Sequence, residues 1–340
     1  MSTNAVQDRP QQQQQQQPRH RSRVLTQEQH DRYQRDGYLI VPDVFTRSEM
    51  QEALAAVDLI TYGKSYAEWS AEFAASGGKT AVADGISAKA QYGRAQFPTG
   101  VWAVDRLIQN QTYLDIYCEL MGSDEPTYLN GHLFVRAGPT DKRHPEHPWE
   151  GYHIDHDTNS FLPPWIGSGH FDYMGSGILL HDINAGCAPM AIVPGSHHAV
   201  ARHLPEWVRS GAFTLPNVIP DIRKLKELEP AVGMTGSCGS AAFSSSYIIH
   251  AAVPFKDKTQ QRSLWTLSLG RSAGQAYNRY SVPYHYGERE FFIPFWTKTT
   301  PQVRSLFGWP PPGDPYYTPQ TLEMLGLRFP GMDLSAYRAW

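Results

Sequence analysis

Two histidines and a carboxylate are the residues of this 340-residue chain best suited to hold a metal ion. His153 and Asp155 are two positions apart, and in an extended strand side chains at that spacing point to the same face. His250 lies much further along, at the end of an apolar run. Two imidazoles and one carboxylate, with the other positions open, are typical of mononuclear non-haem Fe(II) sites. We therefore predict His153, Asp155 and His250 as metal ligands and as the catalytic centre.

Arg262 is the residue predicted to complete this site. It follows His250 by twelve positions and opens a second strand-like run, residues 263–269. A guanidinium is planar and binds a carboxylate through two parallel hydrogen bonds. On a strand beside the metal ligands it would hold a dicarboxylate co-substrate.

A second histidine and aspartate at the same spacing compete with the first pair. His170 and Asp172 lie in a glycine-rich stretch, residues 167–177, which is a poor setting for a rigid ligand strand. They also leave little room for further strands before the Pro-Gly-Ser-His turn at residues 194–197. We therefore favour His153 and Asp155.

Composition excludes several classes of protein. The net charge is −3, with 41% hydrophobic and 19% charged residues, so we expect a globular protein with a real core and no nucleic-acid partner. No apolar run is long enough to cross a bilayer, which predicts no membrane partner. The three cysteines show no CxxC spacing, which argues against disulfides and thiolate zinc. A cytoplasmic protein with a small-molecule substrate fits best.

Helices are expected mainly in the first third of the chain. Residues 1–23 form a Gln-rich tail that we expect to be disordered, followed by a single domain at 24–340. Thr26 predicts the start of a helix that runs to Arg35, and Thr46 with Glu49 forms a second capping box. Periodic apolar residues predict a longer helix over residues 104–121, while residues 61–100 give no clear pattern.

Strands follow from residue 126 onward. In residues 127–135, Leu129, Leu133 and Val135 share one face, whereas Asn130 and His132 share the other and either line a pocket or make core hydrogen bonds. Short strands with Gly and Pro turns after helices predict a mainly β protein with flanking helices. The expected strands are residues 38–41, 127–135, 177–183, 190–193, 240–252 and 263–271. Their core spans about 126–275, and the aromatic extension at about 277–340 would wrap the core, cover the site or make a dimer contact.

Taken together, these motifs resemble the phytanoyl-CoA dioxygenase family of Fe(II)/2-oxoglutarate-dependent oxygenases. The resemblance covers roughly residues 25–275: the opening LTQEQHDRYQRDGYLIV, the His153-Ile154-Asp155 motif, the Pro-Gly-Ser-His turn, and His250 with Arg262. It implies a double-stranded β-helix, or jelly-roll, core. It also implies Fe(II) on His153, Asp155 and His250, 2-oxoglutarate as co-substrate on Arg262, and dioxygen as oxidant. The expected reaction is hydroxylation, or another oxidation, of a small organic molecule, natural products included.

Two other functions remain open from the residues alone. One is a metal-binding jelly roll that is not an oxygenase, such as a cupin-like enzyme. The other is a catalytically inactive binding protein of the same fold. Arg262 separates the oxygenase from the first of these, because a buried arginine there has no purpose without a dicarboxylate to bind. The oligomeric state is not predicted.

Overall fold

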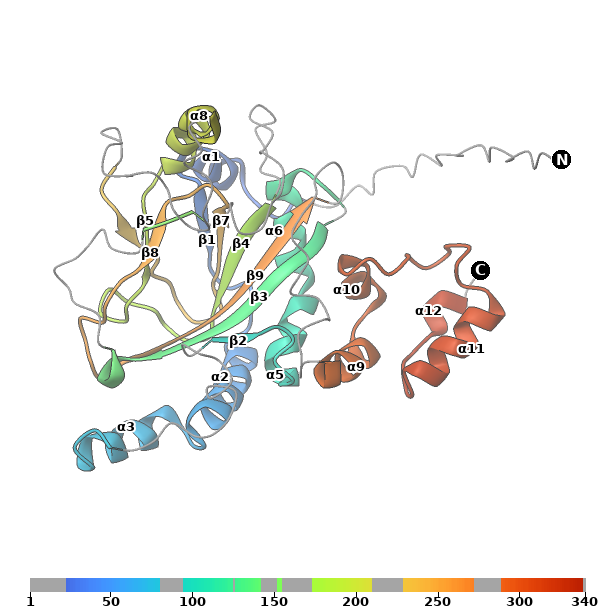
Figure 1. Cartoon of the computed structure of the whole chain (residues 1–340), viewed down its shortest axis with the longest axis horizontal. Coiled ribbons are helices and arrows are strands. Elements are labelled where there is room, and N and C mark those ends of the chain that lie inside the picture. Colours follow the sequence, from blue (N-terminus) through green and yellow to red (C-terminus); the bar gives the residue numbers. More distant parts are fainter. Residues whose placement is uncertain are drawn as a thin grey trace.

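Two antiparallel sheets form the centre of the protein in a computed structural model, which describes residues 23–79, 94–124, 126–141, 152–154, 173–209, 229–271 and 289–338 (Figure 1). The large sheet has six strands in the order β1-β7-β4-β9-β3-β2, and the small sheet has the order β6-β5-β8. The strands of the large sheet are β1 (Tyr38–Val41), β2 (Arg94–Gln96), β3 (Pro126–Ala137), β4 (Tyr173–Leu179), β7 (Ala241–Ser245) and β9 (Gln261–Arg271). Those of the small sheet are β5 (Met190–Ile192), β6 (Val232–Gly233) and β8 (His250–Ala252).

The chain passes repeatedly between the two sheets. From β3 in the large sheet it reaches His153, which bridges to β8 in the small sheet, and returns to β4. It then runs through β5 and β6, back to β7, across to β8 and back to β9. This alternation is the winding of a double-stranded β-helix, so the predicted jelly-roll core with flanking helices is confirmed.

Each face of the large sheet packs against a different layer. Leu264 of β9 belongs to a cluster with Ile192 and Ile248, which lie on the small-sheet side. Trp265 and Leu267, at the alternate positions, belong to a larger cluster with residues of the helices. Because side chains alternate along a strand, even-numbered residues of β9 face the small sheet and odd-numbered residues face the helices. We call these the inner and outer faces of the large sheet.

The N-terminal helices begin and end where local sequence signals place them. Helices α1 (Gln27–Asp36) and α2 (Arg47–Tyr62) both start with complete capping boxes, at Thr26 and Thr46. Each ends at a glycine in the left-handed conformation. Both starts were predicted. Helix α3 (Tyr66–Ala75), in the stretch without a clear pattern, has the same kind of box at Ser65 and Glu68.

The single helix predicted over residues 104–121 is wrong in one respect. The segment divides into α5 (Trp102–Asp105), the 3-10 turn η1 (Arg106–Gln109) and α6 (Gln111–Met121). Asn110 interrupts it with an extended ψ of 118°, and its side chain caps α6 by accepting from the Tyr113 amide. The apolar periodicity continues across this break, which is why it suggested one helix.

The strand predicted at residues 177–183 is also displaced. β4 begins at Tyr173 and ends at Leu179, so Gly175, which lay before the predicted strand in the glycine-rich stretch, is within it, and Gly177, the first residue of the predicted strand, is in its interior. A Cβ on Gly177 would be 2.9 Å from Leu264 Cδ1. A side chain at position 177 would therefore displace the Leu264 side chain, which is consistent with a glycine in the interior of this strand.

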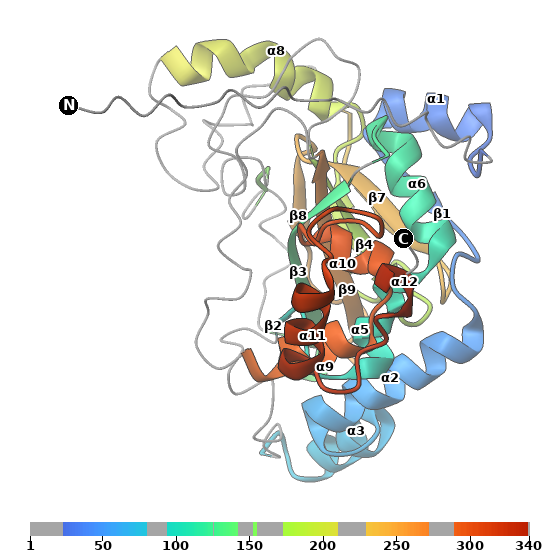
Figure 2. The same cartoon turned by 90° about the vertical axis from the view of Figure 1, so that its right-hand side faces the viewer.

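The C-terminal segment packs on the outer face of the large sheet, so among the described residues it wraps the core (Figures 1 and 2). The Phe307 ring stacks on Tyr128 of β3 at 4.5 Å between centroids, and Phe295 meets Phe97 edge-on at 5.0 Å. The helices of this segment are α9 (Arg289–Lys298), α10 (Pro301–Leu306), α11 (Pro319–Arg328) and α12 (Ser335–Arg338). The remaining described helices are α8 (Ser196–Arg209) and η2 (Gly138–Thr140).

Several predictions lie outside the described residues. They are the Gln-rich tail up to residue 22, Asp155, and the competing pair His170 and Asp172. Within the part of the chain that the structure describes, no helix has both the length and the apolar character needed to cross a membrane.

Candidate metal centre

His153 and His250 lie side by side, although they are far apart in sequence. Each donates its backbone N–H to the other's carbonyl, at 3.0 Å in both directions, as an isolated antiparallel bridge. Their imidazole centroids are 4.4 Å apart. Residues directly opposite in an antiparallel pair project to the same side. The structure therefore brings together two of the three predicted ligands.

The third predicted ligand, Asp155, lies outside the described residues. Among the residues that are described, no group of three or more His, Cys, Asp or Glu side chains is arranged to hold a metal ion. His153 takes part in a β-bridge, so its backbone is extended there. A carboxylate two residues further along an extended chain would face the same side.

The ring of His250 is oriented by a hydrogen bond to the backbone. Its Nδ1 is 3.1 Å from the carbonyl oxygen of Ile248. A carbonyl can only accept, so Nδ1 carries the proton and Nε2 keeps its lone pair. This arrangement, in which one ring nitrogen donates to a backbone carbonyl, is common for histidines that bind metals through the other nitrogen.

The residue before His250 is held by the Pro-Gly-Ser-His segment. The Ile249 N–H donates to the fully buried Ser196 hydroxyl at 2.8 Å, and the Ile249 carbonyl accepts from the Val193 N–H at 3.0 Å. Gly195 has φ +72°, as expected for a turn that needs glycine. Sequence reasoning predicted the turn but missed Ser196. No local signal marks this contact, because its partner is more than fifty residues away.

Arg262 lies on the inner face of β9 and is 5% exposed. Its Nη1 donates to the carbonyl oxygen of Ala188 at 2.8 Å. Arg136 of β3 is its register partner and pairs with Asp141 at 3.0 Å. A buried guanidinium thus lies on the face of the sheet toward the space between the sheets.

Two titratable neighbours of Arg262, His181 and Cys187, are neutral near pH 7. Burial, and then the arginine charge, lower the pKa of His181, whose Nε2 accepts from the Ser263 N–H at 3.0 Å. Burial raises the pKa of the Cys187 thiol to about 11, with Arg262 acting in the opposite direction. These two groups therefore place no negative charge beside Arg262, which leaves it suited to an anionic ligand.

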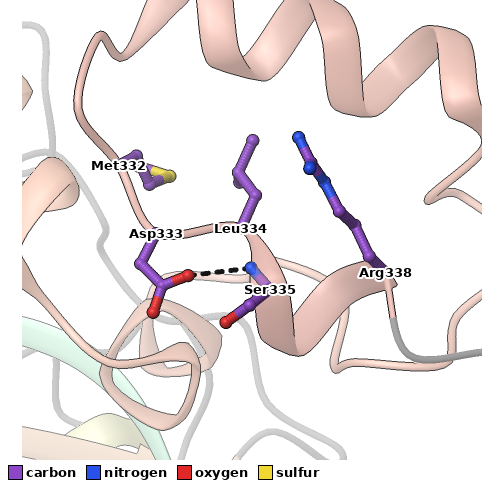
Figure 3. A pocket seen from close by; sticks show the side chains of 5 residues that line it. All are labelled: Met332, Asp333, Leu334, Ser335 and Arg338. Carbon is purple, nitrogen blue, oxygen red and sulfur yellow. Dashed lines mark hydrogen bonds between the residues drawn. The ribbon is translucent and has the colours of Figure 1, made fainter.

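A separate hollow on the C-terminal segment is lined by other residues (Figure 3). The Asp333 carboxylate there accepts from the Ser335 N–H at 2.9 Å, which ties down the turn that begins α12. None of the predicted site residues lines it. Its lining is Met332, Asp333, Leu334, Ser335 and Arg338.

The comparison with protein families gives one match, to the family described as phytanoyl-CoA dioxygenase (PhyH), over residues 33–261. The matched region contains His153 and His250 and ends one residue before Arg262. No curated protein matched the chain.

Solved structures with a similar fold include EctD from S. alaskensis with bound Fe, at 18% identity over 73% of this chain and 77% of that chain, with a TM-score of 0.47. HygX from Streptomyces hygroscopicus with iron bound is 14% identical over 74% and 89%, with a TM-score of 0.43. The non-heme alpha ketoglutarate dependent epimerase SnoN from nogalamycin biosynthesis is 15% identical over 72% and 82%, with a TM-score of 0.44.

The family match begins within α1 and continues to the first residue of β9, so it takes in most of the sandwich and both paired histidines. On the extent of that match, the chain belongs to the phytanoyl-CoA dioxygenase family.

Proposed function

We propose that the protein is a non-haem Fe(II)/2-oxoglutarate-dependent dioxygenase that hydroxylates, or otherwise oxidises, a small organic molecule. The observation that carries this proposal is the pairing of His153 with His250 at the edge of the small sheet. Iron and 2-oxoglutarate are the cofactor and co-substrate that go with this family.

The residues present fit an iron ion. In the proposal His153, Asp155 and His250 are the ligands, a set of two imidazoles and one carboxylate that leaves further positions open. The hydrogen bond from His250 Nδ1 to Ile248 supports this role, because it directs the lone pair of Nε2 away from the backbone. The reciprocal backbone bonds fix the spacing of the two rings.

Arg262 is the proposed anchor for the far carboxylate of 2-oxoglutarate. It is buried on the inner face, and its contact with Ala188 uses Nη1. Hydrogen bonds from a guanidinium to a carboxylate are charge-assisted and gain strength where water is excluded.

When bound, Fe(II) and 2-oxoglutarate would supply the oxidising power. Dioxygen and 2-oxoglutarate would give succinate and carbon dioxide, with one oxygen atom inserted into a substrate C–H bond. The chain's own residues orient the bound groups and shield them from water. Leu179, Leu264 and Ile192 pack together between the sheets, and in the proposal this apolar packing excludes water from one side of the site. Ser196 and Ile248 hold the strand and the ring of His250 in place.

Anaerobic titration tests the proposal. The protein with Fe(II) and 2-oxoglutarate should develop a weak visible charge-transfer band, because the keto acid chelates the metal. His250→Ala should bind neither iron nor 2-oxoglutarate in this manner. A colourless wild-type mixture would reject the oxygenase in favour of a cupin-like enzyme or an inactive binding protein.

Arg262→Ala tests the proposed 2-oxoglutarate site specifically. It should weaken 2-oxoglutarate binding by about 100-fold, since charged hydrogen bonds contribute roughly 1.5–3 kcal/mol each. Fe(II) affinity should stay near that of wild type. Arg262→Lys keeps the charge but loses the planar fork, so it should recover part of the affinity and also control for misfolding. Unchanged 2-oxoglutarate affinity in Arg262→Ala would contradict the assignment.

A further inference from the structure

A histidine side chain takes the place of a strand beside the proposed co-substrate anchor. β4 ends at Leu179, whose register partner on β9 is Leu264. One more residue in this register would place Leu180 opposite Ser263, but the strand has already ended. The backbone N–H of Ser263 donates instead to Nε2 of His181, at 3.0 Å. Because Ser263 is fully buried, an N–H without an acceptor at this point would be costly.

The two contacts of the His181 ring require the same tautomer. Its Nδ1 is 3.0 Å from the carbonyl oxygen of Asp182. A carbonyl can only accept, so Nδ1 carries the proton and Nε2 has the lone pair that the Ser263 N–H needs. Burial, and then the charge of Arg262, lower the pKa of His181, which favours this neutral form. The ring is therefore a neutral acceptor and adds no positive charge beside Arg262.

The segment that carries His181 is fixed by contacts that do not involve β9. The Asp182 carboxylate accepts from the Cys238 N–H at 2.7 Å. Ile183 and Gly236 donate their N–H groups to each other's carbonyls, at 2.9 and 3.0 Å. Both contacts run to the connection between β6 and β7. His181 is therefore attached to a part of the fold that can hold the start of β9 in place.

The same segment reaches the start of β9 again at its far end. The Ala188 carbonyl accepts from Arg262 Nη1 at 2.8 Å, and the Cys187 thiol donates to the Gln261 carbonyl at 2.7 Å. Ala188 is fully buried and has φ +46°, in the left-handed region that residues with a side chain rarely adopt. Such strained conformations persist where the surroundings impose them, and they cluster at ligand sites. Residues 181–188 thus contact three successive residues of β9, centred on Arg262.

We propose that His181 is a positioning residue for 2-oxoglutarate binding, because its bond to the Ser263 N–H fixes the backbone that carries Arg262. The proposal rests on the proposed function. Only one residue of β9 precedes Arg262, so the guanidinium depends on how firmly the start of the strand is held. β3 holds one side of it, through the pairing of Arg136 with Arg262, and His181 holds the side that β4 does not reach. A displaced guanidinium would lose the geometry of its parallel hydrogen bonds to a carboxylate.

Two substitutions of His181 test this role by calorimetry on the anaerobic Fe(II) protein. His181→Leu removes the acceptor and keeps much of the volume, so it should weaken 2-oxoglutarate binding by about tenfold, as loss of a residue behind a ligand-binding group does. His181→Gln places an amide oxygen within similar reach of the Ser263 N–H and should recover most of the affinity. Fe(II) affinity should stay near that of wild type in both variants. A glutamine variant as weak as the leucine variant would refute the role of acceptor.

Amide hydrogen exchange tests the contact without any bound group. The Ser263 amide should exchange slowly in wild type and in His181→Gln, and faster in His181→Leu, because its acceptor is lost only there. Slow exchange in His181→Leu would show that the imidazole does not hold the strand. Faster exchange with unchanged 2-oxoglutarate affinity would show that the contact does not position Arg262. Either result refutes the proposal.

His30→Leu is the matched control, because it makes the same change at a half-buried histidine of α1. His30 Nε2 lies 3.1 Å from a Glu119 carboxylate oxygen, so the variant should lose stability without a change in 2-oxoglutarate affinity. An equal loss of affinity in this variant would assign the effect of His181→Leu to general loosening and overturn the inference. The charge-transfer band separates the two levels of failure. Without it in wild type the proposed function fails, whereas a normal band with unchanged affinity in His181→Leu rejects only this inference.

Discussion

The inner and outer faces of the large sheet are built from the same strands and differ in almost every other respect. On the outer face, Trp265, Leu267 and Leu269 are fully buried against the helical layer. On the inner face, the intervening positions hold Thr266 and Ser268, which are half-buried and polar. At these positions the outer face is apolar and buried and the inner face is polar, whereas Leu264, further along the inner face, is buried in the apolar cluster between the sheets. The comparison indicates that over residues 265–269 of β9 a single residue step separates the buried apolar positions from the half-buried polar ones.

Replacing neighbouring residues of β9 tests this separation directly. Trp265→Ala removes a fully buried ring that packs 5.4 Å from Phe97, and it should lower the free energy of unfolding by about 3–5 kcal/mol. Thr266→Ala, one step along, removes one hydrogen bond and should cost about 1 kcal/mol. Urea unfolding of both variants measures the difference. Equal losses in the free energy of unfolding would show that the two faces contribute equally to stability.

A pH titration tests the contribution of the buried His197 side chain to stability. His197 is 1% exposed and lies against Gly37, with Nε2 3.0 Å from the Gln34 carbonyl. Burial, and then the neighbouring His198, lower the pKa of His197 from 6.5 to about 4. Between those values the unfolded chain binds more protons than the folded one, so stability falls as pH decreases from about 6.5 to 4.

The full loss over that window is up to about 3 kcal/mol, at 1.36 kcal/mol per pKa unit. His197→Gln should flatten the pH dependence of the melting temperature in that range, whereas the exposed neighbour change His198→Gln should leave most of it. If His197→Gln retains the wild-type slope, another group is responsible.

Ser196 links the stability of the fold to the metal centre. Ser196→Ala leaves the buried Ile249 N–H without its acceptor, which should cost about 1–3 kcal/mol. Since this contact positions the residue before His250, Fe(II) affinity should also fall, by about tenfold. Anaerobic metal titration measures it.

Ser245→Ala is the matched comparison for that change. Its hydroxyl accepts from the Tyr247 N–H at 3.1 Å, in the turn that leads from β7 into β8, so this hydrogen bond ends two residues before Ile249. We expect a similar loss of stability with Fe(II) affinity unchanged. If both serine variants lose Fe(II) affinity equally, then His250 is positioned by the whole connection into β8, and the Ser196 contact has no particular role.

Local signals in the sequence predicted the parts of this fold that are locally determined. The helix start at Thr46 depends on contacts within four residues, and the Glu49 side chain completes them. The same signal at Ser65 was present but was not recognised among weakly periodic neighbours. Asn110 could also have been recognised as a cap, although the apolar spacing on both sides concealed it.

Features set by distant contacts could not be predicted in this way. Gly175 suggested a loop, because only the opposing strands show that this position lies within the sheet, where a side chain would contact Ser244. The pairing of His153 with His250 was anticipated from ligand chemistry and from the family resemblance, since nothing in the local sequence of either residue specifies it. The role of Asp155 as third ligand remains a prediction.

The reciprocal bond between the two histidines has a dynamic consequence. Each residue's amide proton is hydrogen-bonded to the other's carbonyl. Neither proton can exchange with deuterium in the solvent unless this pair of backbone hydrogen bonds breaks. The two protons should therefore be lost together, as one event. Their common exchange rate would report how often the two strands part at the point where the chemistry is proposed to occur.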